Sequence, residues 1–487
     1  MSEDTPVNAG VPIVWPDTDT AFFRVRRMQT KLHQWAKDDP SRRFDDLYNL
    51  VYDPAFLVHA WERVSGNVGA RTAGIDAATV WDIRNRVGVE PFLHRIREEL
   101  KARTFRPVEV RQVMIPKANG KVRKLGIPTV TDRVVQASLK AVLEPIFEAD
   151  FLPCSYGFRP NRRAHDAIAE IHMFATRNYE WVLEADIEAC FDQIDHVALM
   201  DRLRMRIKDK RICALVKAFL KSGIMTSDGE RNVSQTGTPQ GGILSPLLAN
   251  IALTALDEHF ARQWEPVRRL REKRVKQGLG NWRLVRYADD FVLMVHGQRH
   301  HAEALRHETA AALQPLGLRL SLDKTRVVHI DEGFDFLGTN IRRRNKRGTT
   351  KRHIYTQPSK KAVQAIKDKV KTETRRSTRN MPVKTMLLRM SRITRGWAHY
   401  HKHGVAKSVF HHVDNHTWFR LTQWIRHKHH RLTWTEYRRR FCLPGTWIPA
   451  HDGVRYHGAA SVAVTRYRYR GNTIPTPWTP RLATPPT

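Results

Sequence analysis

Residues 283–295 read RLVRYADDFVLMV, in which two apolar runs flank a pair of adjacent carboxylates, Asp289 and Asp290. The flanking residues are β-branched or large and apolar, which is typical of strands, and the segment between them predicts a tight turn. Such a turn would bring both aspartates to one exposed tip. Two carboxylates this close repel each other unless a cation lies between them, which favours a hard divalent metal such as Mg²⁺. The alternative is an ordinary hairpin turn that happens to be rich in aspartate.

The composition indicates a large, basic globular protein. The chain has 487 residues, of which 41% are hydrophobic, and this predicts a packed core divided into two or three domains. The formal net charge of +34 indicates a polyanionic partner, and the usual polyanion is nucleic acid. A basic protein of the membrane surface would need a polybasic amphipathic segment or a lipidation signal, and neither is evident. No apolar run approaches the roughly 18 residues of a membrane span, so no membrane partner is expected.

The cysteines and the N-terminal residues bear on the compartment. The chain has four cysteines, which are far apart and form no Cys-x-x-Cys pair, so neither a disulfide framework nor a cysteine zinc site is indicated. Residues 1–14 are polar and acidic, unlike a signal peptide. We therefore expect a cytoplasmic protein with reduced thiols.

A third carboxylate stands at the end of another apolar run. Residues 181–187 predict a strand that ends near Asp186. An aspartate at the end of a buried strand is costly unless it is paired or binds a metal, so Asp186 is expected beside Asp289 and Asp290. A helix cap is the alternative, although Asp192 or Asp195 would serve that role better than Asp186. Three carboxylates can hold two Mg²⁺ ions, or Mn²⁺ as a substitute, which would activate a 3′-hydroxyl and stabilise a pyrophosphate leaving group.

A basic hairpin is predicted upstream. Residues 108–128 alternate as two strands joined at Asn119-Gly120, the strongest short signal for a hairpin. Lys117 and Arg123 lie near its end, and we expect them to bind the incoming nucleoside triphosphate. The alternative is a hairpin that is merely basic and solvated.

A glycine-rich loop and a lysine complete the candidate site. Residues 235–246 lead into an apolar helix, an arrangement that lets backbone N–H groups approach a ligand. Lys324 is a candidate to neutralise or protonate the leaving group. Strands and helices mix from residue 106 to residue 345, which predicts an α+β fold with a largely antiparallel sheet.

The charge is concentrated in the C-terminal third. Between Gly338 and Gly445 there are 28 lysines and arginines against four carboxylates, interleaved with Trp, Tyr and His. This excess indicates a surface that follows a phosphate backbone, with a solvated charged face as the alternative. Residues 342–347 are expected to form a basic linker before helices. Histidines cluster here too, but without cysteines at ligand spacing zinc is not favoured. The alternating run 462–469 predicts a strand.

Six motifs follow one another along the chain, and together they resemble the group II intron-encoded reverse transcriptase/maturase family over about residues 20–445. The motifs are Ile115-Pro116-Lys117 with Leu125-Gly126-Ile127-Pro128, Ser155-Tyr156-Gly157-Phe158-Arg159-Pro160, Asp186 with Phe191-Asp192, Thr238-Pro239-Gln240-Gly241-Gly242, Tyr287-Ala288-Asp289-Asp290, and Arg395-Gly396-Trp397-Ala398-His399-Tyr400.

The resemblance implies a right-hand polymerase with fingers, a palm and an α-helical thumb or maturase domain. It implies that the Ile187 carbonyl helps Asp186, Asp289 and Asp290 to hold metal. It also implies that Phe191 lies under the sugar and excludes a 2′-hydroxyl, and that Gln240 lines the nucleotide pocket. The residues expected to contact nucleic acid are Arg159, Arg342, Arg343, Arg344, Lys346, Arg347, Arg395 and Trp397.

The expected domains follow from the same comparison. They are a loose N-terminal tail (1–19), a helical N-terminal extension of the fingers (20–105), reverse transcriptase fingers and palm (106–345), a basic helical thumb/maturase domain (346–445) and a C-terminal tail (446–487).

The resemblance implies an RNA-directed DNA polymerase that binds intron RNA, assists its splicing and copies it into DNA during retrohoming. Its expected partners are intron RNA, an RNA template with a DNA primer, target DNA and dNTPs. Many relatives carry a C-terminal zinc-bound endonuclease with paired cysteines, and no cysteine follows Cys442, so an endonuclease-lacking member is expected. A primer would then come from elsewhere, such as a host replication fork. The alternatives are a domesticated polymerase in host or anti-phage defence, and a non-catalytic RNA-binding splicing cofactor, against which the three carboxylates weigh.

Overall fold

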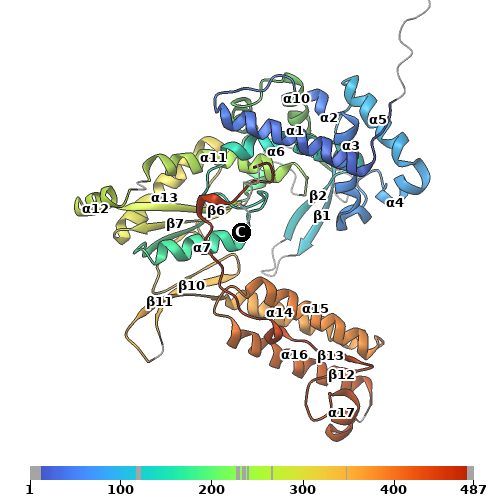
Figure 1. The fold of residues 1–487 in the computed structure, drawn as a ribbon, viewed down its shortest axis with the longest axis vertical. Coiled ribbons are helices and arrows are strands. Elements are labelled where there is room, and N and C mark those ends of the chain that lie inside the picture. The colour runs from blue at the N-terminus through green and yellow to red at the C-terminus, as the bar shows by residue number, and fades with distance from the viewer. Residues whose placement is uncertain are drawn as a thin grey trace, which may run out of the picture.

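The computed structural model shows three parts that follow one another along the chain (Figure 1). N-terminal helices and a small sheet form the first part, a larger antiparallel sheet between helices forms the second, and a helical domain forms the third. The structure describes residues 13–116, 122–225, 231–232, 237, 241–264, 267–346, 348–430 and 432–479.

The N-terminal helices pack around one long buried helix. Asp53 caps α3, accepting a hydrogen bond from the Ala55 N–H, and Pro54 occupies its first turn. Most of α6 is buried, and it contacts both α1 and α3. The helices of this part are α1 (Thr18–Asp38), α2 (Tyr48–Val51), α3 (Pro54–Ser65), α4 (Val80–Asp82), α5 (Val89–Lys101) and α6 (Val130–Asp150).

A four-stranded sheet projects from these helices in the order β2-β1-β4-β5. The first two strands pair antiparallel from Arg111↔Ile127 to Pro116↔Val122, which confirms the predicted hairpin. Its expected tip, residues 117–121, lies outside the described residues. The strands are β1 (Val110–Pro116), β2 (Val122–Ile127), β4 (Ile224–Met225) and β5 (Arg231–Asn232).

The central sheet has the order β6-β7-β3-β8, with antiparallel pairing between all neighbours, so the predicted α+β fold is confirmed. Its strands are β3 (Trp181–Asp186), β6 (Asn281–Tyr287), β7 (Asp290–His296) and β8 (Arg326–His329). Side chains on one face join a core with α7, and those on the other join a core with α11 and α13. The covering helices are α7 (Ala164–Ala175), α11 (Ser245–Gln263) and α13 (Arg299–Leu313).

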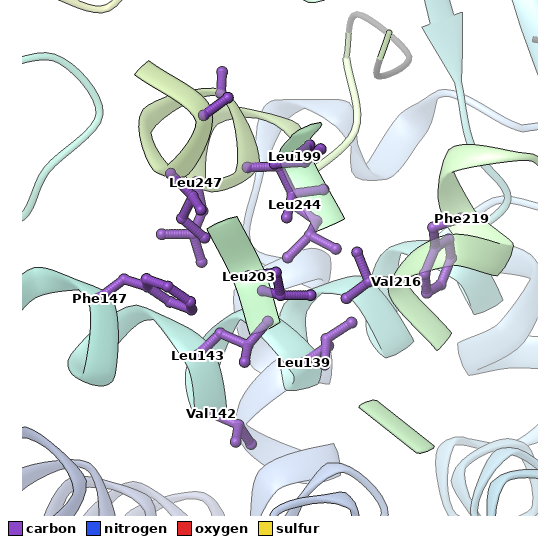
Figure 2. Close-up of a cluster of buried hydrophobic side chains, with 14 of the residues drawn as sticks. Leu139, Val142, Leu143, Phe147, Leu199, Leu203, Val216, Phe219, Leu244 and Leu247 are labelled. Carbon is purple, nitrogen blue, oxygen red and sulfur yellow. The ribbon is translucent and has the colours of Figure 1, made fainter. Parts of the chain in front are cut away.

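A cluster of leucines joins this sheet's helices to the N-terminal part (Figure 2). Leu139 and Leu143 of α6 face Leu203 of α9, which is fully buried, and Val216 of α10 closes the cluster. These side chains come from three helices, α6, α9 and α10, so the cluster fixes how the helices cross. The remaining helices here are α8 (Cys190–Gln193), α9 (His196–Arg204), α10 (Lys210–Leu220) and α12 (Arg268–Lys276).

The third part begins with a three-stranded sheet of order β11-β10-β9 and continues as helices. Most of the expected basic linker, residues 342–345, belongs to β10, so that prediction is wrong, and Arg347 lies outside the described residues. The predicted strand at 462–469 is also wrong, because among the described strands none pairs with these residues. The elements are β9 (Phe334–Phe336), β10 (Thr339–Asn345), β11 (Arg352–Pro358), α14 (Lys360–Glu373), α15 (Val383–His401), α16 (Lys407–Lys428), α17 (Trp434–Phe441), β12 (Ala450–His451) and β13 (Val454–Arg455).

A search of the described helices for a stretch long and apolar enough to cross a membrane finds none. The domain boundaries expected from the sequence remain predictions.

We predict that Leu203→Ala lowers the free energy of unfolding by about 2–5 kcal/mol, because the side chain is fully buried and its removal leaves a cavity. Denaturant unfolding monitored by circular dichroism measures the change. Met205→Ala, two residues on and 59% exposed, is the control and should change stability by no more than about 0.5 kcal/mol. Equal losses in the two variants would contradict this account of the core.

Candidate active site

Three carboxylates meet at one end of the central sheet. The hairpin β6–β7 pairs Tyr287 with Asp290, and Ala288 adopts a left-handed conformation (φ 59°) in the turn between them. Strand β3 lies on the other side of β7, with Asp186 directly opposite Asp290. Paired residues on neighbouring strands bring their side chains within about 4.5–5.5 Å at Cβ. The structure therefore places Asp186 beside the pair that follows far downstream.

The carboxylates disturb one another's ionisation. Desolvation by the surrounding chain, followed by repulsion from Asp289 and Asp186, raises the pKa of Asp290 to about 7, although its side chain stays exposed at the tip. Desolvation and Asp186 also raise the pKa of Asp289, while Arg123 and Lys324 oppose this shift. Arg123 of the β1–β2 hairpin is thus close enough to act on the tip. The site carries excess negative charge that a bound cation would relieve.

Lys324 supplies one such cation. Its ammonium group donates a hydrogen bond to the Asp186 carboxylate, and this contact is the main reason that the pKa of Lys324 is raised. The backbone near Lys324 is hydrogen-bonded to the end of β3. The Ser321 N–H donates to the Asp186 carbonyl at 2.9 Å, and Ile187 forms an isolated antiparallel β-bridge with Leu320. Lys324 therefore lies where the sequence analysis expects it, and its role in proton transfer remains a prediction.

The carboxylates at the tip are chemically suited to bind a divalent metal. Carboxylate oxygens are the ligands that Mg²⁺ prefers, and a bound cation would offset both the desolvation and the repulsion that raise the pKa of Asp290. Within the described part of the chain, no group of three or more His, Cys, Asp or Glu side chains is already gathered in metal-binding geometry. Asp186 instead pairs with Lys324. The expected metal ligands, including the Ile187 carbonyl, stay a prediction.

A buried guanidinium supports the turn that carries the aspartates, and sequence reasoning missed it. Arg286 is completely buried and donates to both oxygens of Asp257, whose carboxylate is equally buried. The same guanidinium reaches Asn250 Oδ1 at 3.0 Å, the Ala288 carbonyl at 3.0 Å and Ser155 Oγ at 2.8 Å. It thus holds the turn between β6 and β7 from within the core. The sequence signal for this role is the position of Arg286 directly before Tyr287.

The loop before α7 presses against the same turn. The Tyr156 N–H donates to the Arg286 carbonyl at 2.8 Å, and Asn250 Nδ2 donates to the Gly157 carbonyl at 2.8 Å. A Cβ atom on Gly157 would lie 2.3 Å from the Ala288 nitrogen, so only glycine fits this approach. The motif at 155–160 therefore positions the carboxylates by packing.

Two arginines expected to bind nucleic acid are instead committed to buried or half-buried ion pairs, and both predictions are corrected. The Arg159 guanidinium is buried and donates to both oxygens of Glu148 and to the Leu152 and Ser155 carbonyls. Arg343 pairs with Glu180 and Asp331, with 14% of its side chain exposed. Because their donors are already used inside the protein, these guanidinium groups hold the fold.

The remaining predicted nucleic-acid contacts fall into two groups. Arg344, Lys346 and Arg395 are exposed, as a phosphate contact requires. Arg342 is half-buried and donates to the Asp331 carbonyl, while Trp397 is half-buried with its ring 5.8 Å from that of Phe410. The structure brings none of these into contact with the carboxylate tip, and their roles remain predictions.

The predicted nucleotide-binding residues are only partly visible. Phe191 is half-buried in α8, close behind β3, with its ring edge-on to Phe158 at 6.3 Å. Arg123 is exposed on β2. Lys117 and Gln240 lie outside the described residues.

We predict that Gly157→Ala loosens the turn between β6 and β7, because the new methyl group would overlap the Ala288 nitrogen. Hydrogen exchange of the amides at 286–290 should become faster, by about tenfold or more if local opening becomes about 1.4 kcal/mol easier. Gly396→Ala is the matched control, since nothing lies within 4 Å of its Cβ position. Unchanged exchange in Gly157→Ala would refute the close approach.

Comparison with known proteins identifies both the central and the C-terminal parts. Residues 115–341 match the family "Reverse transcriptase (RNA-dependent DNA polymerase)", and residues 363–442 match the family "Group II intron, maturase-specific domain". The first match begins at the end of β1 and includes β2 and all three carboxylates, and the second includes helices α15 and α16.

Individual relatives cover different shares of the chain. The chain is 37% identical to "Protein YkfC" of Escherichia coli K12, over 69% of this chain and 93% of that protein. It is 32% identical to "Group II intron-encoded protein LtrA" of Lactococcus lactis subsp. cremoris, over 63% of this chain, and so spans only 58% of that relative's length. Among solved structures, a chain of the "Cas6-RT-Cas1–Cas2 complex" is 22% identical over 55% of this chain and 26% of that chain, with a TM-score of 0.33, a likeness too low to carry an argument.

The matched families, the relatives and the α+β fold with its helical C-terminal domain agree. The chain is a reverse transcriptase that belongs to the group II intron-encoded reverse transcriptase/maturase family.

Proposed function

We propose that this protein copies RNA into DNA by two-metal nucleotidyl transfer at Asp186, Asp289 and Asp290. The observation that carries the proposal is the register that sets Asp186 opposite Asp290 on neighbouring strands, next to Asp289. Three carboxylates at one open strand end, with a raised pKa at Asp290, form a site whose charge calls for a cation.

Reverse transcriptases generally use divalent metal ions, typically Mg²⁺. When bound, the ions would activate the primer 3′-hydroxyl and neutralise the departing pyrophosphate. We propose that the three carboxylates and the Ile187 carbonyl hold two of them. The chain's contribution is then to fix these ligands before the substrate arrives, which the packing of Arg286 against the turn supports.

The protein's own cations and rings would position the substrate. Arg123 already acts electrostatically on Asp289, so the β1–β2 hairpin lies close enough to hold a triphosphate there, together with Lys117. Lys324 beside Asp186 would donate a proton to the leaving pyrophosphate. Phe191, immediately after β3, would press on the sugar and exclude a 2′-hydroxyl, and Gln240 would line the same pocket.

The helical C-terminal domain would bind the intron RNA. Reverse transcriptase and maturase domains act on RNA and other nucleic acids, and this domain matches the maturase-specific family. We propose that its basic surface grips the phosphate backbone of a group II intron, assists splicing, and keeps the RNA in place for reverse transcription during retrohoming. The excess of 28 lysines and arginines over four carboxylates between residues 338 and 445 supports this role.

We predict that Asp289→Ala lowers the rate of primer extension on an RNA template with Mg²⁺ by about 10³-fold or more, because several kcal/mol of transition-state stabilisation are lost with a metal ligand. RNA affinity, measured by filter binding, should stay near that of the wild type, since the basic domain is separate. Asp45→Ala, which removes a carboxylate with 69% of its side chain exposed, is the control and should extend normally. Extension by Asp289→Ala at a rate close to that of the wild type would refute the proposed metal site.

We predict that RNA affinity falls steeply with salt, on the order of 10³-fold between about 50 mM and about 200 mM, because phosphate contacts release counterions. Arg395→Gln should reduce the slope of log affinity against log salt by somewhat less than about one unit. Lys37→Gln, at the far end of α1, removes the same charge and should leave the slope unchanged. A flat salt response in the wild type would argue against phosphate recognition by the basic domain.

A further inference from the structure

The chain returns from the C-terminal domain to the rest of the molecule. After β13, the red end of the ribbon leaves the helices α14–α16, crosses beside α7 and ends near α6 (Figure 1). We call residues 462–479 the return segment. It includes the alternating run 462–469 that the sequence suggested as a strand, and no step of the reaction described above uses it.

The first anchor of the return segment lies on the helical domain. Val462 is buried in a cluster with Phe410 of α16. The Thr465 N–H donates to the Lys402 carbonyl at 2.9 Å, and the Thr465 carbonyl lies 3.0 Å from His403 Nδ1. The segment therefore leaves this domain from the end of α15.

The second anchor is a buried carboxylate on the palm helix α7. Arg470 binds both oxygens of Asp166, with its Nε 2.8 Å from Oδ1 and an Nη 2.6 Å from Oδ2. The Tyr467 hydroxyl donates to the same carboxylate at 2.9 Å, and Asp166 is only 1% exposed. A buried carboxylate stays charged only when it is paired, so Arg470 fixes the segment to α7 by a bidentate, charge-assisted contact.

The third anchor lies on the first helix of the fingers. Trp478 is buried, its Nε1 donates to Gln29 Oε1 at 3.1 Å, and its ring lies 5.5 Å from that of His33. Just before it, Asn161 Nδ2 donates to the Pro475 carbonyl at 3.0 Å. The return segment thus contacts all three parts of the polymerase within 18 residues.

The alternation in the sequence now has a cause. Tyr467 and Tyr469 turn toward α7, where their hydroxyl groups meet Asp166 and Glu170. Arg466 and Arg468, which alternate with the two tyrosines, are exposed, and within the described chain neither makes an ion pair or hydrogen bond. One face of an extended segment is therefore buried against a helix, which gives a period of two without a partner strand.

We propose that the return segment sets the position of the helical domain relative to the palm, so that the primer–template duplex stays held between successive nucleotide additions. The chain first passes from the sheet β11-β10-β9 to the helices α14–α17 between β11 and α14, and the Tyr400 hydroxyl also holds these helices to the Leu337 carbonyl. The return segment adds a second crossing that is anchored on both palm and fingers. Arg470 and Tyr467 act as positioning residues, and this role rests on the polymerase function proposed above.

This arrangement separates two properties of the enzyme. The side-chain hydrogen bonds of Asp166 and Arg470 within the described chain are to each other, to Arg163, Tyr467 and Asn161, and none is to one of the three carboxylates, so we expect loosening them to leave the chemistry of one addition intact. The grip on the duplex depends on the position of the helical domain, so a looser domain releases the primer–template sooner. Processivity, the number of additions per binding event, is therefore the quantity that the return segment controls.

The test compares Arg470→Ala with Arg468→Ala, which removes the same charge two residues away on the exposed face. Primer extension on a long RNA template is started together with an excess of a competitor that captures any enzyme released from the primer–template. Each enzyme molecule then acts for one binding event. We expect Arg470→Ala to shorten the products by about tenfold, the effect of losing one charge-assisted contact of ordinary strength, with the rate of adding a single nucleotide unchanged. Arg468→Ala should match the wild type in both measurements.

Two further variants keep the outcome decisive. Arg470→Lys retains the charge and should restore part of the product length, and Tyr467→Phe removes a single hydroxyl should Arg470→Ala fail to fold by circular dichroism. Wild-type product length in folded Arg470→Ala, or in Tyr467→Phe where only that variant folds, would overturn the inference. Absence of single-nucleotide addition by the wild-type protein would instead overturn the proposed polymerase function.

Discussion

The pairing of Arg286 with Asp257 is the constraint on which the carboxylate tip depends. A guanidinium with no solvent exposure is tolerated only when its donors are satisfied, and removal of one partner would leave a charge stranded in the core. Here the Arg286 guanidinium donates hydrogen bonds to Asp257 of α11, to Ser155 in the loop before α7, and to the Ala288 carbonyl in the turn between β6 and β7. The turn is thus fixed by the interior of the protein, which leaves the tip free to face a substrate.

The distribution of charge divides the labour between the parts of the molecule. The tip concentrates negative charge, and Arg123 and Lys324 approach it from two different elements. Most of the positive excess lies in the helical domain, beyond residue 338. In the proposed function, a polyanion is drawn to the molecule by its overall field but meets negative charge at the three carboxylates, where a substrate that carries cations is favoured. Binding and chemistry can consequently be altered separately.

Much of the fold was readable because its signals are local. Alternating apolar residues around an Asn-Gly pair fix the hairpin β1–β2, and the apolar runs beside Asp289 fix β6–β7. The failures concern partners that are distant in sequence. Nothing near Arg159 reveals that Glu148 will accept its guanidinium in the core, and nothing near Arg343 announces Glu180. In a basic chain, the local sequence around an arginine does not distinguish a residue that binds phosphate from one that forms an ion pair inside the fold.

The motif at 395–400 stabilises the packing of the helical domain on the rest of the protein through its last residue. Its last residue, Tyr400, donates from its hydroxyl to the Leu337 carbonyl at 2.9 Å, and its own carbonyl lies 2.6 Å from His165 Nε2. Burial raises the pKa of Tyr400, with a further contribution from Tyr287 of the catalytic turn. The end of α15 therefore contacts both the turn between β9 and β10 and the helix α7. In the proposed function, RNA bound by the helical domain would be connected through Tyr400 to Leu337 and to His165 of α7, the helix that packs on the sheet carrying the three carboxylates.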